Sequence, residues 1–176
     1  MTDIFDKFYC GDCLAVMKDF PDGSFDLILT SPPYADQRLY GDSEDVIKPD
    51  DYIEWFRGKA VEIYRVLSNK GSFVLNINDK VVDGFQHLFV YELVICLCRE
   101  IGFHLVRDYI WYNPATPPNV FSRGGLGRTK KSHEYCFWFS KSDEWTFNLD
   151  PIRKPYGKDM QRYLEGKGKG TREANT

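Results

Sequence analysis

Phe25-Asp26-Leu27-Ile28-Leu29-Thr30-Ser31-Pro32-Pro33-Tyr34 is the stretch of sequence on which the fold and the function both depend. Its first six residues are nearly all apolar and predict a central parallel strand covered on both faces. The two prolines fix φ at about −65° and remove two backbone donors, so the strand ends in a stiff turn whose carbonyls lack a ladder partner. Such a turn suits a flat, amine-bearing ring, because carbonyls accept N–H groups and Tyr34 can cover the ring face. A purely structural turn with a core tyrosine is the alternative.

The rest of the chain alternates between strand and helix patterns. Apolar runs predict strands at 8–10, 25–30, 72–78, 103–112, 134–139 and 145–147. Helical spacing predicts a first helix over 13–19, capped by Asp12. A second helix is predicted from Asp50 or Asp51 to about 67, with Gly71 as a left-handed cap at its end. A third is predicted over 88–101. This order predicts an α/β fold: a mainly parallel sheet with an antiparallel strand added at one edge. Ligands then bind beyond the carboxyl ends of the strands, where Ser31–Tyr34 and Asn76–Asp79 lie.

Composition places the chain among ordinary globular proteins. Its 176 residues suffice for one domain with a buried core, and no apolar run is long enough for a membrane span. The acidic start of the sequence lacks the pattern of a signal peptide, so we expect a cytoplasmic protein. Cys10 and Cys13 form a C-x-x-C pair, which can indicate zinc. Without a second pair, reduced and mostly buried thiols are the better interpretation, and we expect no metal.

Charge is unevenly distributed along the chain. Residues 1–60 carry thirteen Asp and Glu against six Lys and Arg, whereas residues 151–176 carry three against seven. Arg123, Arg128, Lys130 and Lys131 add a basic loop without a nearby acid. An acidic N-terminal part and a basic C-terminal part are consistent with a protein that binds a polyanion through one side only. A solvated loop and a disordered tail remain the alternative.

Several segments together resemble a known family. They are Gly11-Asp12-Cys13, the stretch from Asp26 to Tyr34, the segment from Tyr64 to Leu75, Ile110-Trp111-Tyr112, and the segment from His133 to Lys141. The chain resembles the amino-group DNA methyltransferases over about residues 8–155, in the permuted class whose Ser-Pro-Pro-Tyr motif lies near the N-terminus. The Gly-Asp turn some 20 residues before that tetrapeptide makes the resemblance specific.

The resemblance implies a Rossmann-like methyltransferase sheet that uses S-adenosylmethionine to methylate an exocyclic amine of a flipped DNA base. In that family the residues matching Ser31 and Pro32 accept hydrogen bonds from the amine, Pro33 stiffens the turn, and Tyr34 stacks on the base. Double-stranded DNA with a specific site is the implied partner, together with a cognate restriction endonuclease.

The resemblance also implies a cofactor site at Asp12, Cys13 and Thr30. The acid that matches Asp12 accepts from the adenine amine of the cofactor, and the backbone N–H matching Cys13 donates to the adenine ring. A role for Asp12 as a helix cap is the ordinary alternative, and the two roles are compatible.

The basic residues divide between two predicted regions. Arg123, Arg128, Lys130 and Lys131 are candidates for phosphate contacts. We expect residues 1–150 to form the catalytic core with the target-base loop, and residues 151–176 to begin a basic recognition segment or a flexible tail.

One feature of the family is missing from the sequence. A cofactor loop of the Phe-x-Gly-x-Gly type should follow a buried strand, but the glycine-rich runs at 124–127 and 166–170 neither follow such a strand nor open a helix. In the permuted class this loop comes after the recognition segment. We therefore expect an incomplete fold, the N-terminal part of a longer enzyme whose glycine loop lies beyond residue 176 or in another chain.

Serine at the first position of the tetrapeptide favours cytosine N4 as the methylated atom over adenine N6. Two other functions remain open. One is methylation of RNA or of a protein amide by the same chemistry. The other is a non-catalytic nucleic-acid-binding module that kept the fold and lost the cofactor site.

Overall fold

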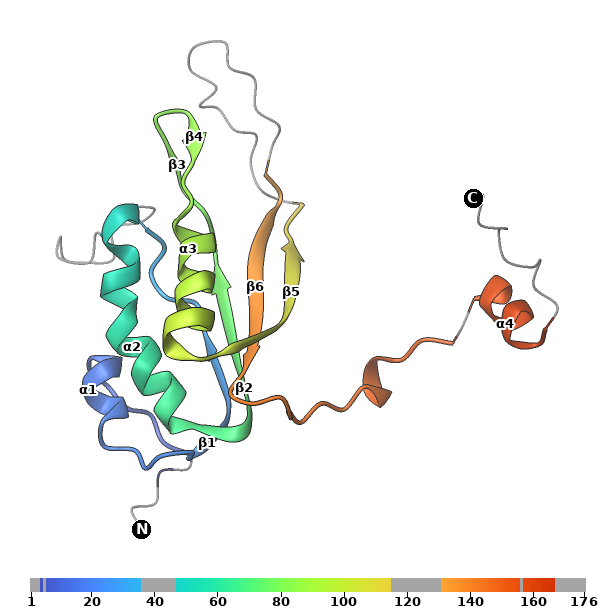
Figure 1. Ribbon diagram of the computed structural model, residues 1–176, viewed down its shortest axis with the longest axis horizontal. Helices are drawn as coiled ribbons and strands as arrows, with labels where there is room; N and C mark the ends of the chain where they lie inside the picture. Colours follow the sequence, from blue (N-terminus) through green and yellow to red (C-terminus); the bar gives the residue numbers. More distant parts are fainter. Residues whose placement is uncertain (1–3, 5, 36–46, 115–130, 156, 167–176) are drawn as a thin grey trace. The chain divides into compact units, whose positions relative to one another are not determined.

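The computed structural model describes residue 4 and residues 6–35, 47–114, 131–155 and 157–166 (Figure 1). The chain divides into two compact units, Met1–Thr146 and Phe147–Thr176. The second unit holds a short 3₁₀ turn, Asp150–Ile152, and the helix α4, Lys158–Leu164. No helix among the described residues has the length and apolar character needed to cross a membrane. The expected division of roles at residue 150 stays a prediction.

The first unit is built on a four-stranded sheet in the order β1, β2, β6, β5. The strands are β1 (Phe25–Thr30), β2 (Leu67–Ile77), β6 (His133–Ser140) and β5 (His104–Tyr112). β1 and β2 pair in parallel, while β6 runs antiparallel to both of its neighbours. The α/β class is as expected, but the antiparallel strand lies between β2 and β5 rather than at an edge. The reason is burial, because the last four residues of β6 are buried and β5 is largely exposed.

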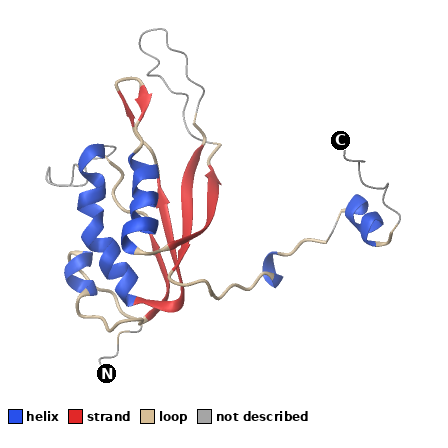
Figure 2. Cartoon of the chain, in the orientation of Figure 1, coloured by secondary structure: helices blue, strands red, loops and turns tan. Residues whose placement is uncertain are grey.

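Three helices accompany this sheet: α1 (Cys13–Met17), α2 (Tyr52–Val66) and α3 (Phe89–Cys96), the last extended by a π-helical turn, Leu97–Ile101. Gly102 ends that turn with a φ of +103°, a conformation that favours glycine. α2 and α3 lie along one face of the sheet (Figures 1 and 2). Every second residue of β2 and β6 faces them, and the core includes Phe56, Ile63, Phe73, Leu75, Leu93, Phe137 and Phe139.

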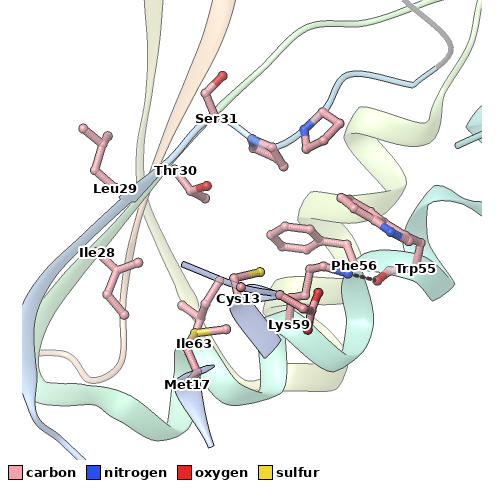
Figure 3. Close-up of a pocket in the computed structure, with 14 residues that line it drawn as sticks. Cys13, Met17, Ile28, Leu29, Thr30, Ser31, Trp55, Phe56, Lys59 and Ile63 are labelled. Carbon is pink, nitrogen blue, oxygen red and sulfur yellow. Dashed lines mark hydrogen bonds between the residues drawn. The ribbon is translucent and has the colours of Figure 1, made fainter. Parts of the chain in front are cut away.

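The other face of β1 is open among the described residues. Leu27 and Leu29 are 61% and 69% exposed, and Leu29 lies on the opposite side of the strand from Phe56 and Trp55 (Figure 3). The expectation of a central strand covered on both faces is therefore wrong for the described sheet. Within the described sheet β1 is an edge strand, since it pairs only with β2. Leu27 and Leu29 are exposed because the described helices pack on the opposite face.

Local details of the helix ends also differ from expectation. Asp51 precedes α2, but its side chain makes no cap hydrogen bond, and Asp50 instead contacts Nε2 of His87 at 2.9 Å. Gly71 is not a helix cap, because β2 already begins at Leu67. A Cβ atom at Gly71 would lie 2.8 Å from the Leu67 side chain, so close packing is the reason for this glycine.

Three short segments differ as well. Residues 8–10 and 145–147 are not strands in the structure, although both were expected to be. Residues 79–86, for which neither a strand nor a helix is predicted, contain a small hairpin of β3 (Val81–Val82) and β4 (Phe85–Gln86). The sequence signal for this hairpin is the Asp83-Gly84 dipeptide, which is typical of tight hairpin turns. In the structure these two residues have positive φ angles of 49° and 88°, as such turns require.

Arg65 ties α2 to the connection between α1 and β1. Its guanidinium donates to the carbonyl oxygens of Phe20 at 2.8 Å and Met17 at 2.7 Å. It also forms ion pairs with Glu62 and Asp22. The planar fork of arginine satisfies these acceptors at once, which a lysine cannot do.

We expect Arg65→Ala to lower the midpoint of thermal unfolding by several degrees, because two backbone carbonyls lose a charged donor. Arg65→Lys should recover only part of the loss. Arg57→Ala is the matched control on the same helix, since Arg57 forms ion pairs with the exposed carboxylates of Glu54 and Glu100. Equal effects of Arg65→Ala and Arg57→Ala in differential scanning calorimetry would contradict the assigned role of Arg65.

Candidate base and cofactor site

The turn after β1 is held by the first turn of α2. Pro32 is buried and Ser31 is exposed. The hydroxyl of the fully buried Tyr52 donates to the carbonyl oxygen of Pro33 at 2.8 Å. The expectation that the carbonyls of the turn stay free is thus wrong for Pro33, whose carbonyl has an internal partner. Tyr52 fixes the turn against the core, and the Ser31 side chain stays accessible.

Tyr52→Phe should therefore loosen the turn while leaving the aromatic packing in place. We expect a loss of about 1 kcal/mol in the free energy of unfolding, the usual net value of one hydrogen bond. Urea unfolding measures it, with Tyr109→Phe as control, because the exposed Tyr109 should change stability by less than about 0.5 kcal/mol. An effect of Tyr52→Phe no larger than that of the control would show that the bond to Pro33 contributes nothing.

Tyr34 lies at the edge of the sheet where β1 and β2 end and β6 begins. Its hydroxyl lies 3.2 Å from Oγ of Ser31, 2.8 Å from Oδ1 of Asn76 and 2.7 Å from Oε2 of Glu134. The register of the sheet explains this convergence. Asn76 at the end of β2 pairs with Cys136 of β6, and Glu134 lies two residues further on, so both side chains are on one face.

Sequence reasoning found only part of this group. Asn76 belongs to the strand end predicted to lie near a ligand, whereas no role is predicted for Glu134. The signal that identifies Glu134 is its register with β2, which requires knowing that β6 pairs antiparallel to β2.

Burial and hydrogen bonding raise the pKa of Tyr34 to about 12. Burial contributes most, the hydrogen bond from Ser31 acts in the opposite direction, and the hydrogen bond and charge of Glu134 add to the increase. The pKa of Tyr135 is also raised to about 12, by burial first and then by its hydrogen bond with Tyr91. The fold therefore favours the neutral form of both phenols.

Stability should depend on alkaline pH accordingly. Both folded-state pKa values lie above the ordinary value of 10, so the contribution is complete below pH 10 and is lost as the pH rises toward 12. We expect the free energy of unfolding to fall between about pH 10 and about pH 12 in urea titrations, the interval between the ordinary pKa of tyrosine and the raised pKa of both residues. The double variant Tyr34→Phe, Tyr135→Phe should fall less, and an identical decrease would contradict the prediction.

A cavity of about 540 Å³ lies between α1, the end of β1 and α2 (Figure 3). Its lining includes the turn Gly11–Cys13, Met17 of α1, the segment Ile28–Pro33, and residues of α2 such as Trp55, Phe56 and Lys59. The structure thus brings all three predicted cofactor residues, Asp12, Cys13 and Thr30, to one cavity with Ser31, Pro32 and Pro33. Tyr34 follows directly after this lining.

Asp12 can serve both of its predicted roles. As expected, it caps α1, with Oδ1 accepting from the backbone N–H of Ala15 at 3.0 Å. A carboxylate has two oxygens and about four acceptor positions, so this cap leaves capacity for a ligand. The cofactor contacts of Asp12, Cys13 and Thr30 stay predictions.

Trp55 and Lys59 are cavity residues that sequence reasoning missed. The Lys59 ammonium lies 4.0 Å from the centre of the Trp55 ring and donates to the Trp55 carbonyl at 3.2 Å. Both side chains are half-buried. Their spacing of four residues on a helix, next to the core residue Phe56, was the available signal.

The basic loop lies mostly outside the described residues, and this applies to Arg123, Arg128 and Lys130. Lys131 is described and forms an ion pair with Asp79 at 2.7 Å. Its Nζ also donates to Asn78 at 2.6 Å. Contact between these four basic residues and nucleic acid stays a prediction, and Lys131 would have to exchange internal partners to make it.

The cysteines are free thiols, as expected, but fewer are buried than expected. Cys10 and Cys13 are exposed, whereas Cys96 is buried on α3. Among the described residues, no three His, Cys, Asp or Glu side chains gather into a group that could hold a metal ion.

Residues 25–175 match a protein family described as DNA methylase. This chain belongs to that family. The match covers the turn Ser31–Tyr34, the helices α2 and α3, and all four strands of the sheet. The resemblance inferred from the sequence is confirmed at the level of the family, and the permuted order of motifs stays a prediction.

The relatives are type II methyltransferases. The chain is 30% identical over 165 residues to M.PvuII of Proteus hauseri, covering 90% of this chain and 48% of that protein. It is 29% identical over 167 residues to M.BglII of Bacillus subtilis, covering 93% and 43%. The chain thus spans about half the length of these relatives.

The solved structure of PvuII DNA methyltransferase (cytosine-N4-specific) matches with a TM-score of 0.70 at 25% identity, covering 90% of this chain and 62% of that chain. The similarity confirms the α/β methyltransferase fold class of this DNA methylase chain. The roles of its individual site residues stay predictions.

Proposed function

We propose that this chain forms the base-holding part, and a share of the cofactor site, of a DNA methyltransferase that uses S-adenosylmethionine. The main observation in support of this proposal is that one cavity is lined by both the turn Gly11–Cys13 and the turn residues Ser31–Pro33. Membership of the DNA methylase family supports the same reaction. The proposed acceptor is N4 of cytosine, supported by Ser31 at the first position of the tetrapeptide and by the cytosine-N4 specificity of the PvuII relative.

The turn suits an aromatic amine for a chemical reason. The lone pair of such an amine is delocalised into the ring, so the nitrogen is a poor nucleophile. Fixed acceptors for its N–H groups, here the Ser31 hydroxyl oxygen and the Pro32 carbonyl, draw the nitrogen toward a tetrahedral form with a localised lone pair. Stacking on Tyr34 is worth roughly 1–3 kcal/mol, which offsets much of the few kcal/mol that base flipping costs.

The cavity fits the proposed cofactor in size and in donor set. Its volume of about 540 Å³ lies within the range of roughly 300–1,000 Å³ of ligand pockets. When bound, S-adenosylmethionine supplies a methyl group on a sulfonium sulfur, which leaves as a neutral thioether. Asp12 offers acceptors to an adenine amine, Cys13 offers its backbone N–H to the ring, and Lys59 offers a cation to a carboxylate.

The proposed substrate is double-stranded DNA at a specific site, which the basic segments would contact through phosphates. A cognate restriction endonuclease and a cytoplasmic location complete the proposal. Each of these properties concerns the whole protein.

The product of the reaction tests the proposal. The complete gene is expressed in a host that lacks its own DNA methylation, and the DNA nucleosides are measured by mass spectrometry. We expect N4-methylcytosine. N6-methyladenine without N4-methylcytosine would overturn the choice of base. Unmodified DNA, combined with no binding of S-adenosylmethionine by calorimetry, would instead support the non-catalytic module.

Ser31→Ala should lower the methylation rate by about 100-fold, the size expected when one preorganised hydrogen-bonding group is lost. Cofactor binding by calorimetry should stay unchanged, because the backbone of the turn is kept. Ser68→Ala is the matched control, since the Ser68 hydroxyl bonds Asp26 near the other end of β1. Equal rates for Ser31→Ala and Ser68→Ala would remove Ser31 from the proposed mechanism.

A further inference from the structure

A chain of hydrogen bonds runs from Ser31 through Tyr34 to Glu134. Oγ of Ser31 donates to the Tyr34 hydroxyl oxygen at 3.2 Å, and the Tyr34 hydroxyl donates to Oε2 of Glu134 at 2.7 Å. We infer that Glu134 and Asn76, acting through Tyr34, hold the Ser31 hydroxyl proton in its hydrogen bond to the Tyr34 oxygen, directed into the protein. The turn then recognises an exocyclic amine and rejects a carbonyl at the same position of the base. This inference rests on the proposed function.

The direction of the chain follows from its inner end. A carboxylate can only accept hydrogen bonds, so the hydroxyl of Tyr34 must donate to Glu134. The Tyr34 oxygen is then an acceptor, and the Ser31 hydroxyl supplies the proton. With its single proton directed inward, Ser31 presents only lone pairs to the outside.

Asn76 reinforces the same direction. Its Nδ2 donates to the Tyr135 carbonyl at 3.1 Å and approaches Sγ of Cys136 at 3.4 Å. The amide group is thereby oriented with Oδ1 toward Tyr34, at 2.8 Å from the hydroxyl. Both inner neighbours of the Tyr34 hydroxyl are therefore acceptors. The pairing of β2 with β6 keeps Asn76 and Glu134 in this arrangement.

The consequence is selection between bases of similar shape. Cytosine carries an amine at the position where uracil carries a carbonyl oxygen. The outward lone pairs of Ser31 accept from the amine, but they repel the carbonyl, which loses its water without gaining a donor. The same argument separates adenine from hypoxanthine, so the selection does not depend on which amine is methylated.

Mononucleotide binding tests this inference on the chain itself. The chain is labelled with ¹³C in its tyrosine rings, the Tyr34 signal is assigned with Tyr34→Phe, and dCMP and dUMP are titrated against it. We expect the wild type to bind dCMP at least about tenfold more tightly than dUMP, the size of one unmatched polar group. In Tyr34→Phe, followed through the remaining ring signals, this ratio should fall but stay above one, because the Ser31 proton is released while the ring and the Pro32 carbonyl remain.

The inner residues are tested with matched variants. Glu134→Gln should give a ratio between those of the wild type and Tyr34→Phe, since an amide competes as a donor and Asn76 still accepts. Glu134→Gln should have no further effect in the Tyr34→Phe background, because Glu134 acts only through that hydroxyl. Glu144→Gln, on an exposed glutamate paired with Lys70, should keep the wild-type ratio.

Two results would overturn the inference. One is a preference for dCMP over dUMP in Tyr34→Phe that equals that of the wild type. The other is a change in this preference on Glu134→Gln that is equally large with and without the Tyr34 hydroxyl. If the wild type binds neither nucleotide, the nucleoside measurement with the complete gene decides the proposed function, and the Tyr34 titration decides the inference. Glu134→Gln should then lower the pKa of Tyr34 from about 12 toward its ordinary value, because Glu134 raises it. The other influences on the pKa of Tyr34 are its burial, the hydrogen bond from Ser31 and the nearby thiol of Cys136. An unchanged Tyr34 pKa would show that the chain of hydrogen bonds is absent.

Discussion

The parallel pairing of β1 with β2 is the constraint on which the candidate site depends. Because the strands run the same way, with Thr30 opposite Leu75, their carboxyl ends meet at one edge of the sheet. The turn after β1 and Asn76 near the end of β2 are therefore neighbours, although they lie more than forty residues apart in the sequence. β6 then begins at the same edge and adds Glu134. One backbone register thus assembles groups from three strands.

α2 supplies the second constraint, because it serves the core and the site together. Its buried face packs on the sheet, and Tyr52 on that face also holds the carbonyl of Pro33. The same helix carries Trp55 and Lys59 to the cavity and, through Arg65, anchors the connection that follows α1. A shift of α2 would therefore disturb the base turn and the cofactor cavity at the same time.

The parts of the fold that depend on local pattern could be predicted from the sequence. The apolar period of α2, the cap at Asp12 and the run at β1 are properties of adjacent residues, and all three are present in the structure. The inner position of β6 and the contact between Tyr34 and Glu134 could not be predicted, since both depend on strand register. The open face of β1 was mispredicted because an apolar run shows what can be buried, not what covers it.

The polar group around Tyr34 is better explained by recognition than by stability. Asn76 is only 8% exposed, and the Tyr34 hydroxyl and the Glu134 carboxylate must also lose water to reach their positions. Their hydrogen bonds return little more than this cost, and apolar side chains of similar volume would stabilise such a site at least as well. What apolar side chains cannot provide is a direction. An acceptor-only inner end fixes where each proton points, and a turn that must distinguish an amine from a carbonyl depends on that direction.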